Sequence, residues 1–131
     1  MAPTTAATAR RAGMPEHFGI RITSAEPDRI AAELDCDERH LNGLGIMHGG
    51  ALMAFADELG GYGAALNIEP GGRTTTLESK TNFFRPCAPG RVTAIAIPLH
   101  RGRRTSVWQT SITGPDGKLV AMVTQTQLVI S

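Results

Sequence analysis

One stretch of the sequence decides the fold: His48-Gly49-Gly50-Ala51-Leu52-Met53-Ala54-Phe55-Ala56-Asp57-Glu58-Leu59, continuing to about Leu66. Alanine, leucine and methionine are good helix formers, and no proline interrupts the run. We therefore predict a helix that begins at the glycine pair and ends near Asn67-Ile68-Glu69-Pro70. Apolar side chains lie on almost every side of this helix, which is typical of a helix that other elements wrap.

Two acidic residues and three glycines interrupt the apolar character of this helix. Asp57 and Glu58 are consecutive, and consecutive helical residues lie about 100° apart around the axis, so their side chains cannot point the same way. At least one of them is expected to face a cleft or an interface. Gly60, Gly61 and Gly63 each weaken the helix by roughly 0.5–1 kcal/mol relative to alanine, which indicates that another element packs closely against its second half.

The composition is that of one ordinary domain. The chain has 131 residues, of which 41% are hydrophobic and 19% charged, and its 13 Lys and Arg nearly balance its 12 Asp and Glu. This balance gives no reason to expect nucleic acid or an anionic membrane as a partner. No apolar run approaches the ~20 residues of a membrane-spanning helix, and the first residues lack the apolar core of a secretion signal. We expect a cytoplasmic protein with a flexible leader over residues 1–13 and a single domain over residues 14–131.

Most of the remaining chain is predicted to form strands. In Arg29-Ile30-Ala31-Ala32-Glu33-Leu34-Asp35, apolar and polar residues alternate as in a half-buried strand. We expect a short helical turn near residues 14–18, a loop over residues 40–47, and turns at residues 26–28 and 114–117. The predicted strands are two within residues 20–36, followed by residues 74–84, 92–99, 105–113 and 119–130. This order predicts an α+β fold in which an antiparallel sheet curls round one long helix.

Several classes of site find no support in the sequence. The four histidines are scattered and lack the spacing of a zinc site. The chain has no phosphate-binding glycine loop and no nucleophile elbow. Cys36 and Cys87 are far apart in sequence, and we expect both to be reduced, inert thiols.

Four residues remain as candidates for chemistry: Asn42, His48, Gly49 and Asp57. A helix start offers unpaired N–H groups, and Gly49 has no side chain, so a substrate carbonyl can approach its N–H closely. Losing one such oxyanion donor commonly costs ~3–4 kcal/mol of barrier. Asp57 lies roughly 12 Å further along the helix axis, too far for one substrate atom to touch both unless a side chain or water spans the gap. A second subunit would ease this, with the carboxylate acting as general base or as nucleophile.

These residues carry a resemblance to a known family. The pattern Asn42-Gly43-x-x-x-Met47-His48-Gly49-Gly50-Ala51 with Asp57 resembles the hotdog-fold acyl-CoA thioesterases, in particular their phenylacetate-degradation (PaaI-like) branch. The resemblance covers about residues 18–130. Three later segments resemble the same branch in the same order: Asn82-Phe83-Phe84-Arg85-Pro86 followed by Gly90, His100-Arg101-Gly102-Arg103-Arg104, and Asp116-Gly117-Lys118-Leu119-Val120-Ala121.

The resemblance implies a hotdog fold and a dimer with one continuous sheet and two active sites at the interface. It implies that the N–H of Gly49 polarises the thioester carbonyl and that Asp57 of the partner subunit is the catalytic carboxylate. Asn42 and His48 match polar residues near the thioester. Thr76 stands where relatives often place a hydroxyl that holds the water.

The same resemblance assigns the binding residues. Some relatives carry a second hydroxyl one helical turn after the carboxylate, where this chain has Gly61. The loop Arg101–Arg104, which includes Gly102 and Arg103 and follows His100, resembles the segment that meets the phosphates of coenzyme A, and guanidinium groups suit phosphate well. Phe83 is the candidate for lining the acyl or pantetheine groove.

Each candidate also has a purely structural interpretation. Asp57 would be a buried structural acid, His48 a helix cap and Asn42 a turn former. Glu58 is expected to be structural or to face an interface. The arginine loop would be a solvated hairpin end.

The hypothesis from the sequence is hydrolysis of an acyl-CoA to the free acid and coenzyme A, without a cofactor and without a metal. The alternatives are an acyl-CoA-binding sensor without turnover and a hotdog hydratase or dehydratase acting on enoyl-CoA. The expected partners are the substrate and further copies of the chain, as a dimer or a tetramer. The acyl group, and acyl carrier protein in place of coenzyme A, stay open.

Overall fold

The computed structural model describes residues 12–130, so the flexible leader expected over residues 1–13 lies almost entirely outside the described residues. Two helices and a short 3-10 turn accompany six strands. In chain order the elements are α1 Met14–Phe18, β1 Arg21–Glu26, β2 Arg29–Cys36, η1 Glu38–His40, α2 Gly49–Ala65, β3 Arg73–Phe83, β4 Gly90–Arg101, β5 Thr105–Thr113 and β6 Leu119–Ile130. The predicted order of helices and strands is confirmed, with differences of one or two residues at the ends of α2, β3 and β4.

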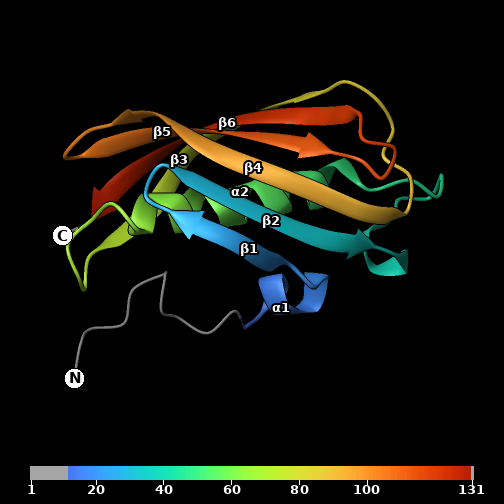
Figure 1. The fold of residues 1–131 in the computed structure, drawn as a ribbon, viewed down its shortest axis with the longest axis horizontal. Helices are drawn as coiled ribbons and strands as arrows, with labels where there is room; N and C mark the ends of the chain where they lie inside the picture. Colours follow the sequence, from blue (N-terminus) through green and yellow to red (C-terminus); the bar gives the residue numbers. More distant parts are fainter. Residues whose placement is uncertain (1–11, 131) are drawn as a thin grey trace.

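The six strands form one antiparallel sheet in the order β1-β2-β4-β5-β6-β3. The sheet curves round α2, which lies along the sheet (Figure 1). The predicted α+β architecture, an antiparallel sheet wrapped round one long helix, is therefore confirmed. Within the described chain, β3 pairs only with β6, so its other edge is open.

The close packing expected from the glycines of α2 is present at two of the three. A Cβ added to Gly60 would lie 2.3 Å from the side chain of Gln125, and one added to Gly63 would lie 2.6 Å from the ring of Trp108. Trp108 is completely buried, as are Phe55 and Leu59 on the helix. Glycine at these positions lets the sheet lie directly on the helix backbone. Gly61 faces open space instead, with no atom of the described chain within 4 Å of an added Cβ.

Two further findings concern the length of the helices and the state of the cysteines. Within residues 12–130, no helix is both long enough and apolar enough to span a membrane. Cys36 and Cys87 are buried and unbridged. Burial raises the pKa of both thiols, that of Cys87 to about 11, which keeps them protonated and unreactive as expected.

Candidate active site

The carboxylate of Asp57 is held by two side chains from the sheet. The Thr76 hydroxyl on β3 donates to Asp57 Oδ1 across 2.7 Å, and Gln125 Nε2 on β6 donates to the same oxygen across 3.1 Å. Gln127 Nε2 in turn donates to Thr76 Oγ1 across 2.6 Å. Asp57 itself is exposed, so its carboxylate is held from the side of the sheet and is accessible to solvent. The alternative of a buried structural acid does not describe this residue.

The sequence did not single out Gln125 and Gln127. Both are 1% exposed and lie on the helix-facing side of β6, on the same face of the strand as the buried Ala121 and Val123. A polar residue at an inward position of an alternating strand needs a hydrogen-bond partner, because burying an unpaired amide is costly. Two such glutamines on one face were therefore a signal for a polar network beneath the sheet.

A cleft of about 340 Å³ opens beside Asp57. Thr74, Thr75 and Thr76 form one wall, and Gln127 reaches its floor. The other wall is the second half of α2, where Gly61 leaves the space that a side chain would fill. Glu58 and Tyr62 also line it. The expectation that at least one of the two acids of the helix faces a cleft is confirmed.

The start of α2 presents an unpaired backbone donor. His48 is the N-cap, and its Nδ1 accepts from the N–H of Gly50 at 2.8 Å, so the capping interpretation of His48 holds. The N–H of Gly49 makes no hydrogen bond within the part of the chain that the structure describes. The ring of Phe83 lies directly over Gly49, 3.2 Å from the position of an added Cβ. Phe83 therefore packs against the residue that carries this N–H.

A second cleft, also of about 340 Å³, contains this donor. Asn42, Gly49, Leu52 and Phe83 line it, and the segment from Phe84 to Cys87 closes one side. Asn42 Oδ1 accepts from the N–H groups of Leu44 and Ile46, at 2.8 and 3.4 Å, so Asn42 also builds the turn before the helix. Asn42 therefore both forms the turn and lines the cleft.

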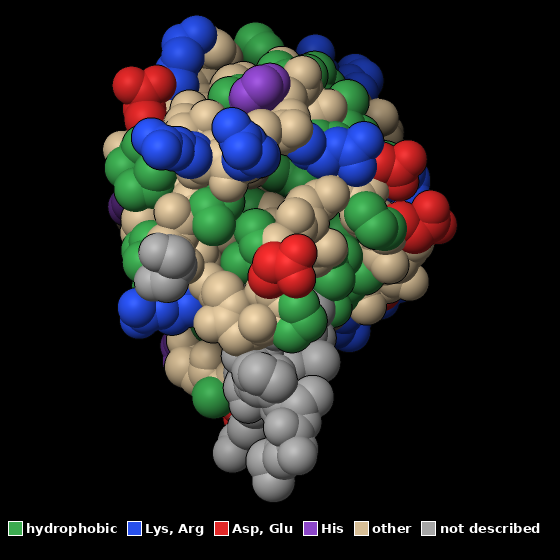
Figure 2. Space-filling view, turned by 90° about the vertical axis from the view of Figure 1, so that its left-hand side faces the viewer, with side chains coloured by type: hydrophobic (Ala, Val, Ile, Leu, Met, Phe, Trp, Pro, Cys, Tyr) green, Lys and Arg blue, Asp and Glu red, His purple; other side chains and the backbone are tan. Residues whose placement is uncertain are grey.

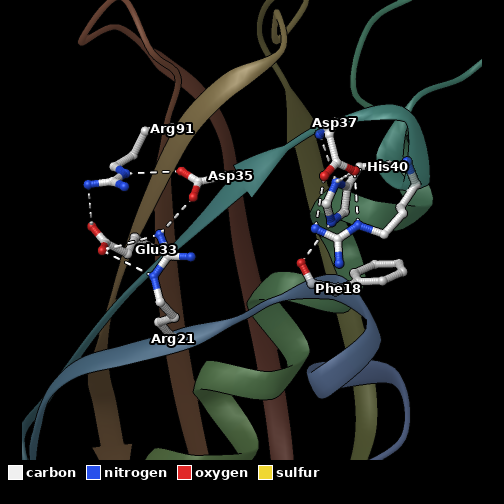
Figure 3. Close-up of polar contacts among 8 residues, drawn as sticks. Phe18, Arg21, Glu33, Asp35, Asp37, His40 and Arg91 are labelled. Atoms are coloured by element: carbon white, nitrogen blue, oxygen red, sulfur yellow. Dashed lines mark hydrogen bonds and ion pairs between the residues drawn. The ribbon is translucent and has the colours of Figure 1, made fainter.

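The loop that carries His48 is braced by the buried His40. Its backbone carbonyl accepts from the N–H of His48 at 2.7 Å. Its Nδ1 accepts from the N–H of Asp37 at 3.0 Å, which leaves Nε2 to donate to the carbonyl of Phe18 at 2.8 Å. Figure 3 shows this cluster beside α1. The short first helix thus supports the loop that delivers the chain to Gly49.

Gly49 and Asp57 line two different clefts on the same helix. The structure therefore brings Asn42, Gly49 and Phe83 together at one site, and Asp57 and Thr76 at another. His48 stands at the first site as the helix cap. This separation agrees with the distance expected from eight residues of helix.

The arginine loop is the β4–β5 hairpin end and lies near the C-terminal end of α2. Arg101, Gly102 and Arg103 line a third cleft of about 470 Å³ together with Asn67 and Ile130. Arg101 Nη1 donates weakly to Asn67 Oδ1 at 3.4 Å. His100 and Arg104 are exposed on the same hairpin. Figure 2, which faces this end, shows a band of Lys and Arg side chains across the surface.

This third cleft neighbours the Asp57 cleft along the seam between β3 and β6. In the β3–β6 register, the pairs Arg73–Ile130 and Thr74–Val129 are separated from Thr76–Gln127 only by Thr75–Leu128. Positive charge therefore stands at one end of the groove that contains Asp57.

The chain matches a known family over its central part. The model of the thioesterase superfamily matches residues 44–121. The 1,4-dihydroxy-2-naphthoyl-CoA hydrolase of Listeria monocytogenes is 34% identical over 110 residues, which cover 84% of this chain and 89% of the relative. The proofreading thioesterase EntH of Klebsiella pneumoniae is 32% identical over 105 residues, covering 80% of this chain and 77% of the relative.

The comparison of structures also finds thioesterases. The crystal structure of a thioesterase from Haemophilus influenzae superposes with a TM-score of 0.84 at 34% identity, covering 88% of this chain and 81% of that chain. The chain belongs to the thioesterase superfamily. The predicted hotdog fold and the predicted class of enzyme, a thioester hydrolase, are confirmed.

Proposed function

We propose that the protein hydrolyses acyl-CoA thioesters at sites that two subunits share. In each site the N–H of Gly49 receives the thioester oxygen, and Asp57 of the partner subunit supplies the carboxylate. The observation that carries this proposal is that α2 holds an unpaired N–H in one cleft and an oriented carboxylate in another. Each cleft lacks what the other contains, so a two-fold axis that joins them completes two equal sites.

The open edge of β3 supports this assembly. Antiparallel pairing of two copies of β3 about a centre between Ser79 and Lys80 would set Thr76 opposite Phe83 of the partner subunit. Thr76 belongs to the Asp57 cleft and Phe83 to the Gly49 cleft. Leu77 and Phe83 are 58% and 51% exposed on this edge, and Met53 is 36% exposed on the helix beside it. Apolar side chains of this size in one area favour a covered surface.

The chemistry follows from the two groups. The N–H of Gly49, at the positive end of α2, stabilises the negative charge that develops on the carbonyl oxygen when a nucleophile adds to the thioester. In one course Asp57 takes a proton from water, and the hydroxide oxygen bonds to the carbonyl carbon. The carbon–sulfur bond then breaks, and the thiolate takes the proton from Asp57 and leaves as coenzyme A.

In the other course, Asp57 itself attacks the carbonyl carbon. The thiolate leaves, and water hydrolyses the resulting mixed anhydride to the acid and the original carboxylate. Hydrolysis in ¹⁸O-labelled water under single-turnover conditions tests for the anhydride. Label in the protein carboxylate establishes attack by Asp57, with water then attacking the Asp57 carbon of the anhydride, whereas the general-base course puts label only into the released acid.

The basic hairpin supports coenzyme A as the thiol carrier. Arg101 and Arg103 line a cleft that neighbours the Asp57 cleft, and a guanidinium group binds phosphate oxygens through paired hydrogen bonds. We assign His100, Arg101, Gly102, Arg103 and Arg104 to this function and Phe83 to the acyl or pantetheine groove. We further propose a cytoplasmic homodimer or homotetramer of the phenylacetate-degradation type.

The Gly49 donor has a sharp test, because Gly49 is the first residue of α2. Proline is well tolerated at this position and lacks an N–H, and His48 before it already has an extended backbone, with φ −63° and ψ 136°. Gly49→Pro is compared with Gly49→Ala, which places a Cβ against Phe83 in the same way but keeps the donor. We expect Gly49→Pro to lose ~100-fold or more in kcat relative to Gly49→Ala. Equal kcat values would exclude the donor role.

The shared site is tested by mixing two inactive chains. Gly49→Pro and Asp57→Ala are produced alone and together under different affinity tags. If the site joins two subunits, each mixed dimer has one intact site, and a random mixture recovers about a quarter of the wild-type activity. If both groups act within one subunit, mixed dimers stay inactive.

The rival functions are tested with the same proteins. Free thiol is measured with benzoyl-, phenylacetyl-, hexanoyl- and palmitoyl-CoA, with Asp57→Ala beside the wild type. Release that Asp57→Ala abolishes supports hydrolysis. Binding of acyl-CoA without release favours the sensor, and loss of enoyl-CoA absorbance without release favours the hydratase.

A further inference from the structure

Two buried primary amides lie beneath the Asp57 cleft and need an explanation beyond packing. Gln125 and Gln127 are each 1% exposed and occupy inward positions of β6, next to the apolar Val123. Amides at such positions are retained when they take part in a specific hydrogen-bond network. Here the network ends on the carboxylate of Asp57.

The direction of every hydrogen bond in this network is fixed. An ionised carboxylate only accepts, so the amide nitrogen of Gln125 must face Asp57. The single hydroxyl proton of Thr76 is directed to Asp57, so Thr76 Oγ1 can only accept from Gln127. The order of donation is therefore Gln127 to Thr76 to Asp57, with Gln125 donating to Asp57 from the other side.

Both donors meet the same carboxylate oxygen. Thr76 and Gln125 bind Oδ1 at 2.7 and 3.1 Å, and Oδ2 has no hydrogen-bond partner within residues 12–130. The carboxylate cannot rotate about its terminal bond without losing both contacts. Oδ2 is thus the oxygen left for water or for the thioester carbon.

The helix is shaped to admit the Gln125 amide. A Cβ on Gly60 would lie 2.3 Å from both Cδ and Oε1 of Gln125, so the amide lies against bare helix backbone. Oε1 has no partner within the described chain, although it is buried. The position of this side chain is therefore set by the donation to Asp57 and by the absence of a side chain on Gly60.

We propose that Gln125 and Gln127 are positioning residues of the thioesterase site: Gln125 acts through Asp57 and Gln127 acts through Thr76, and together they present Oδ2 to the substrate. This inference rests on the proposed function, in which Asp57 is the catalytic carboxylate. Gln125 does not line the cleft, and Gln127 reaches it only with a side chain that is 1% exposed, so the inference predicts an effect on turnover and not on binding.

The first test is Gln125→Met, which keeps the length of the side chain and removes the donor. We expect kcat to fall by about 10–100-fold, the range for one hydrogen bond to a charged group, with KM within 3-fold of wild type. The matched control is Gln109→Met on the outer face of β5, where Gln109 pairs with Ile97 and Thr124. We expect this control to keep wild-type kcat.

The second test has a readout that a merely structural role would not change. In Gln125→Glu, the introduced carboxyl donates to Oδ1 while it is protonated, as the amide does. When it ionises, the donor is lost and two carboxylates face each other. We therefore expect the ratio of kcat for Gln125→Glu to kcat for wild type to fall as pH rises. A ratio that stays constant with pH would overturn the proposal, and this test stands even if Gln125→Met fails to fold.

The outcomes separate this inference from the proposed function. A wild type that releases no thiol from any acyl-CoA overturns both. An active wild type with an inactive Asp57→Ala and a fully active Gln125→Met overturns the positioning role alone. In the double variant Asp57→Ala/Gln125→Met, residues that act as a unit give no further loss beyond Asp57→Ala, whereas independent roles give multiplied losses.

Discussion

The hydroxyl of Thr76 donates to Oδ1 of Asp57 across 2.7 Å, joining the exposed acid of α2 to the edge strand of the sheet. The family resemblance predicts that a hydroxyl at this position holds the attacking water. Here its only proton is directed to the carboxylate, so Thr76 orients Asp57 in this structure.

This contact predicts different results for two substitutions at Thr76. Thr76→Val has nearly the same shape but no donor, and we expect kcat to fall by about 10–100-fold. Thr76→Ser keeps the hydroxyl, and we expect kcat within about 5-fold of wild type, because only a methyl group is removed. Steady-state thiol release measures both. A Thr76→Val enzyme as active as Thr76→Ser would show that the hydroxyl has no function in turnover.

A second threonine, Thr110, predicts a gain in stability when its hydroxyl is removed. Thr110 on β5 is completely buried, and its Oγ1 has no hydrogen-bond partner within the described residues. Replacing an unpaired buried hydroxyl by a methyl group of similar shape removes a desolvation penalty. We expect Thr110→Val to raise the free energy of unfolding by about 1 kcal/mol, as measured by urea denaturation at fixed protein concentration. A loss of stability would reveal a partner for Oγ1, such as an ordered water.

The glycines of α2 provide a pair of neighbouring substitutions with different outcomes. Gly60→Ala places a Cβ where the Gln125 amide lies, and the amide must leave Asp57 to make room. We expect this variant to lose about 1–3 kcal/mol of stability through overpacking and to lose turnover as Gln125→Met does.

Gly61→Ala is the matched control for stability, because an added Cβ meets no atom of the described chain within 4 Å. Alanine favours a helix interior over glycine, so we expect thermal unfolding to show a gain of about 0.5–1 kcal/mol. If both alanines destabilise α2 equally, the contact with Gln125 does not explain Gly60.

The sequence was sufficient where the signal is local. The alternation in residues 29–35 and the turn at residues 114–117 predicted β2 and the β5–β6 hairpin, and the helix formers after His48 predicted α2. Gly49 and Asp57 stand out as candidates in the sequence because a helix start and an acid in an apolar helix are local features. The expected bounds of β5 and β6 match the structure residue for residue.

The sequence was insufficient where the signal is long-range. The pairing of β3 with β6, at the far edge from β2, depends on contacts between segments that no turn joins. The Gln125–Asp57 and Gln127–Thr76 contacts span 68 and 51 residues. The alternating pattern of a strand is the same whether or not an inward-facing glutamine has a hydrogen-bond partner. Only the fold identifies Asp57 and Thr76 as the partners.

The support of α1 predicts a dependence of stability on pH. Arg39 binds the carboxylate of Asp37 through Nε and Nη2, both at 2.9 Å, and also donates to the carbonyl of His17. The hydrogen bonds from Arg39 lower the pKa of Asp37 from 3.8 to about 2. A carboxyl whose pKa is lower in the folded state stabilises the fold above the unfolded pKa and loses this contribution as pH falls through the folded pKa. For Asp37 the window runs from about pH 4 down to about pH 2.

We therefore expect Arg39→Met to lower the Tm at pH 6 and the difference from wild type to narrow as the pH falls from about 4 to about 2. Part of the difference should persist at low pH, because the contact with the His17 carbonyl does not titrate. The control is Arg29→Met, which removes one exposed charge at the opposite end of β2 from Asp37. The difference in Tm between this control and the wild type should not narrow as the pH falls from about 4 to about 2. If the Arg39→Met difference is as large at pH 2 as at pH 6, the ion pair with Asp37 does not stabilise the fold, and the support of α1 comes from the backbone contact alone.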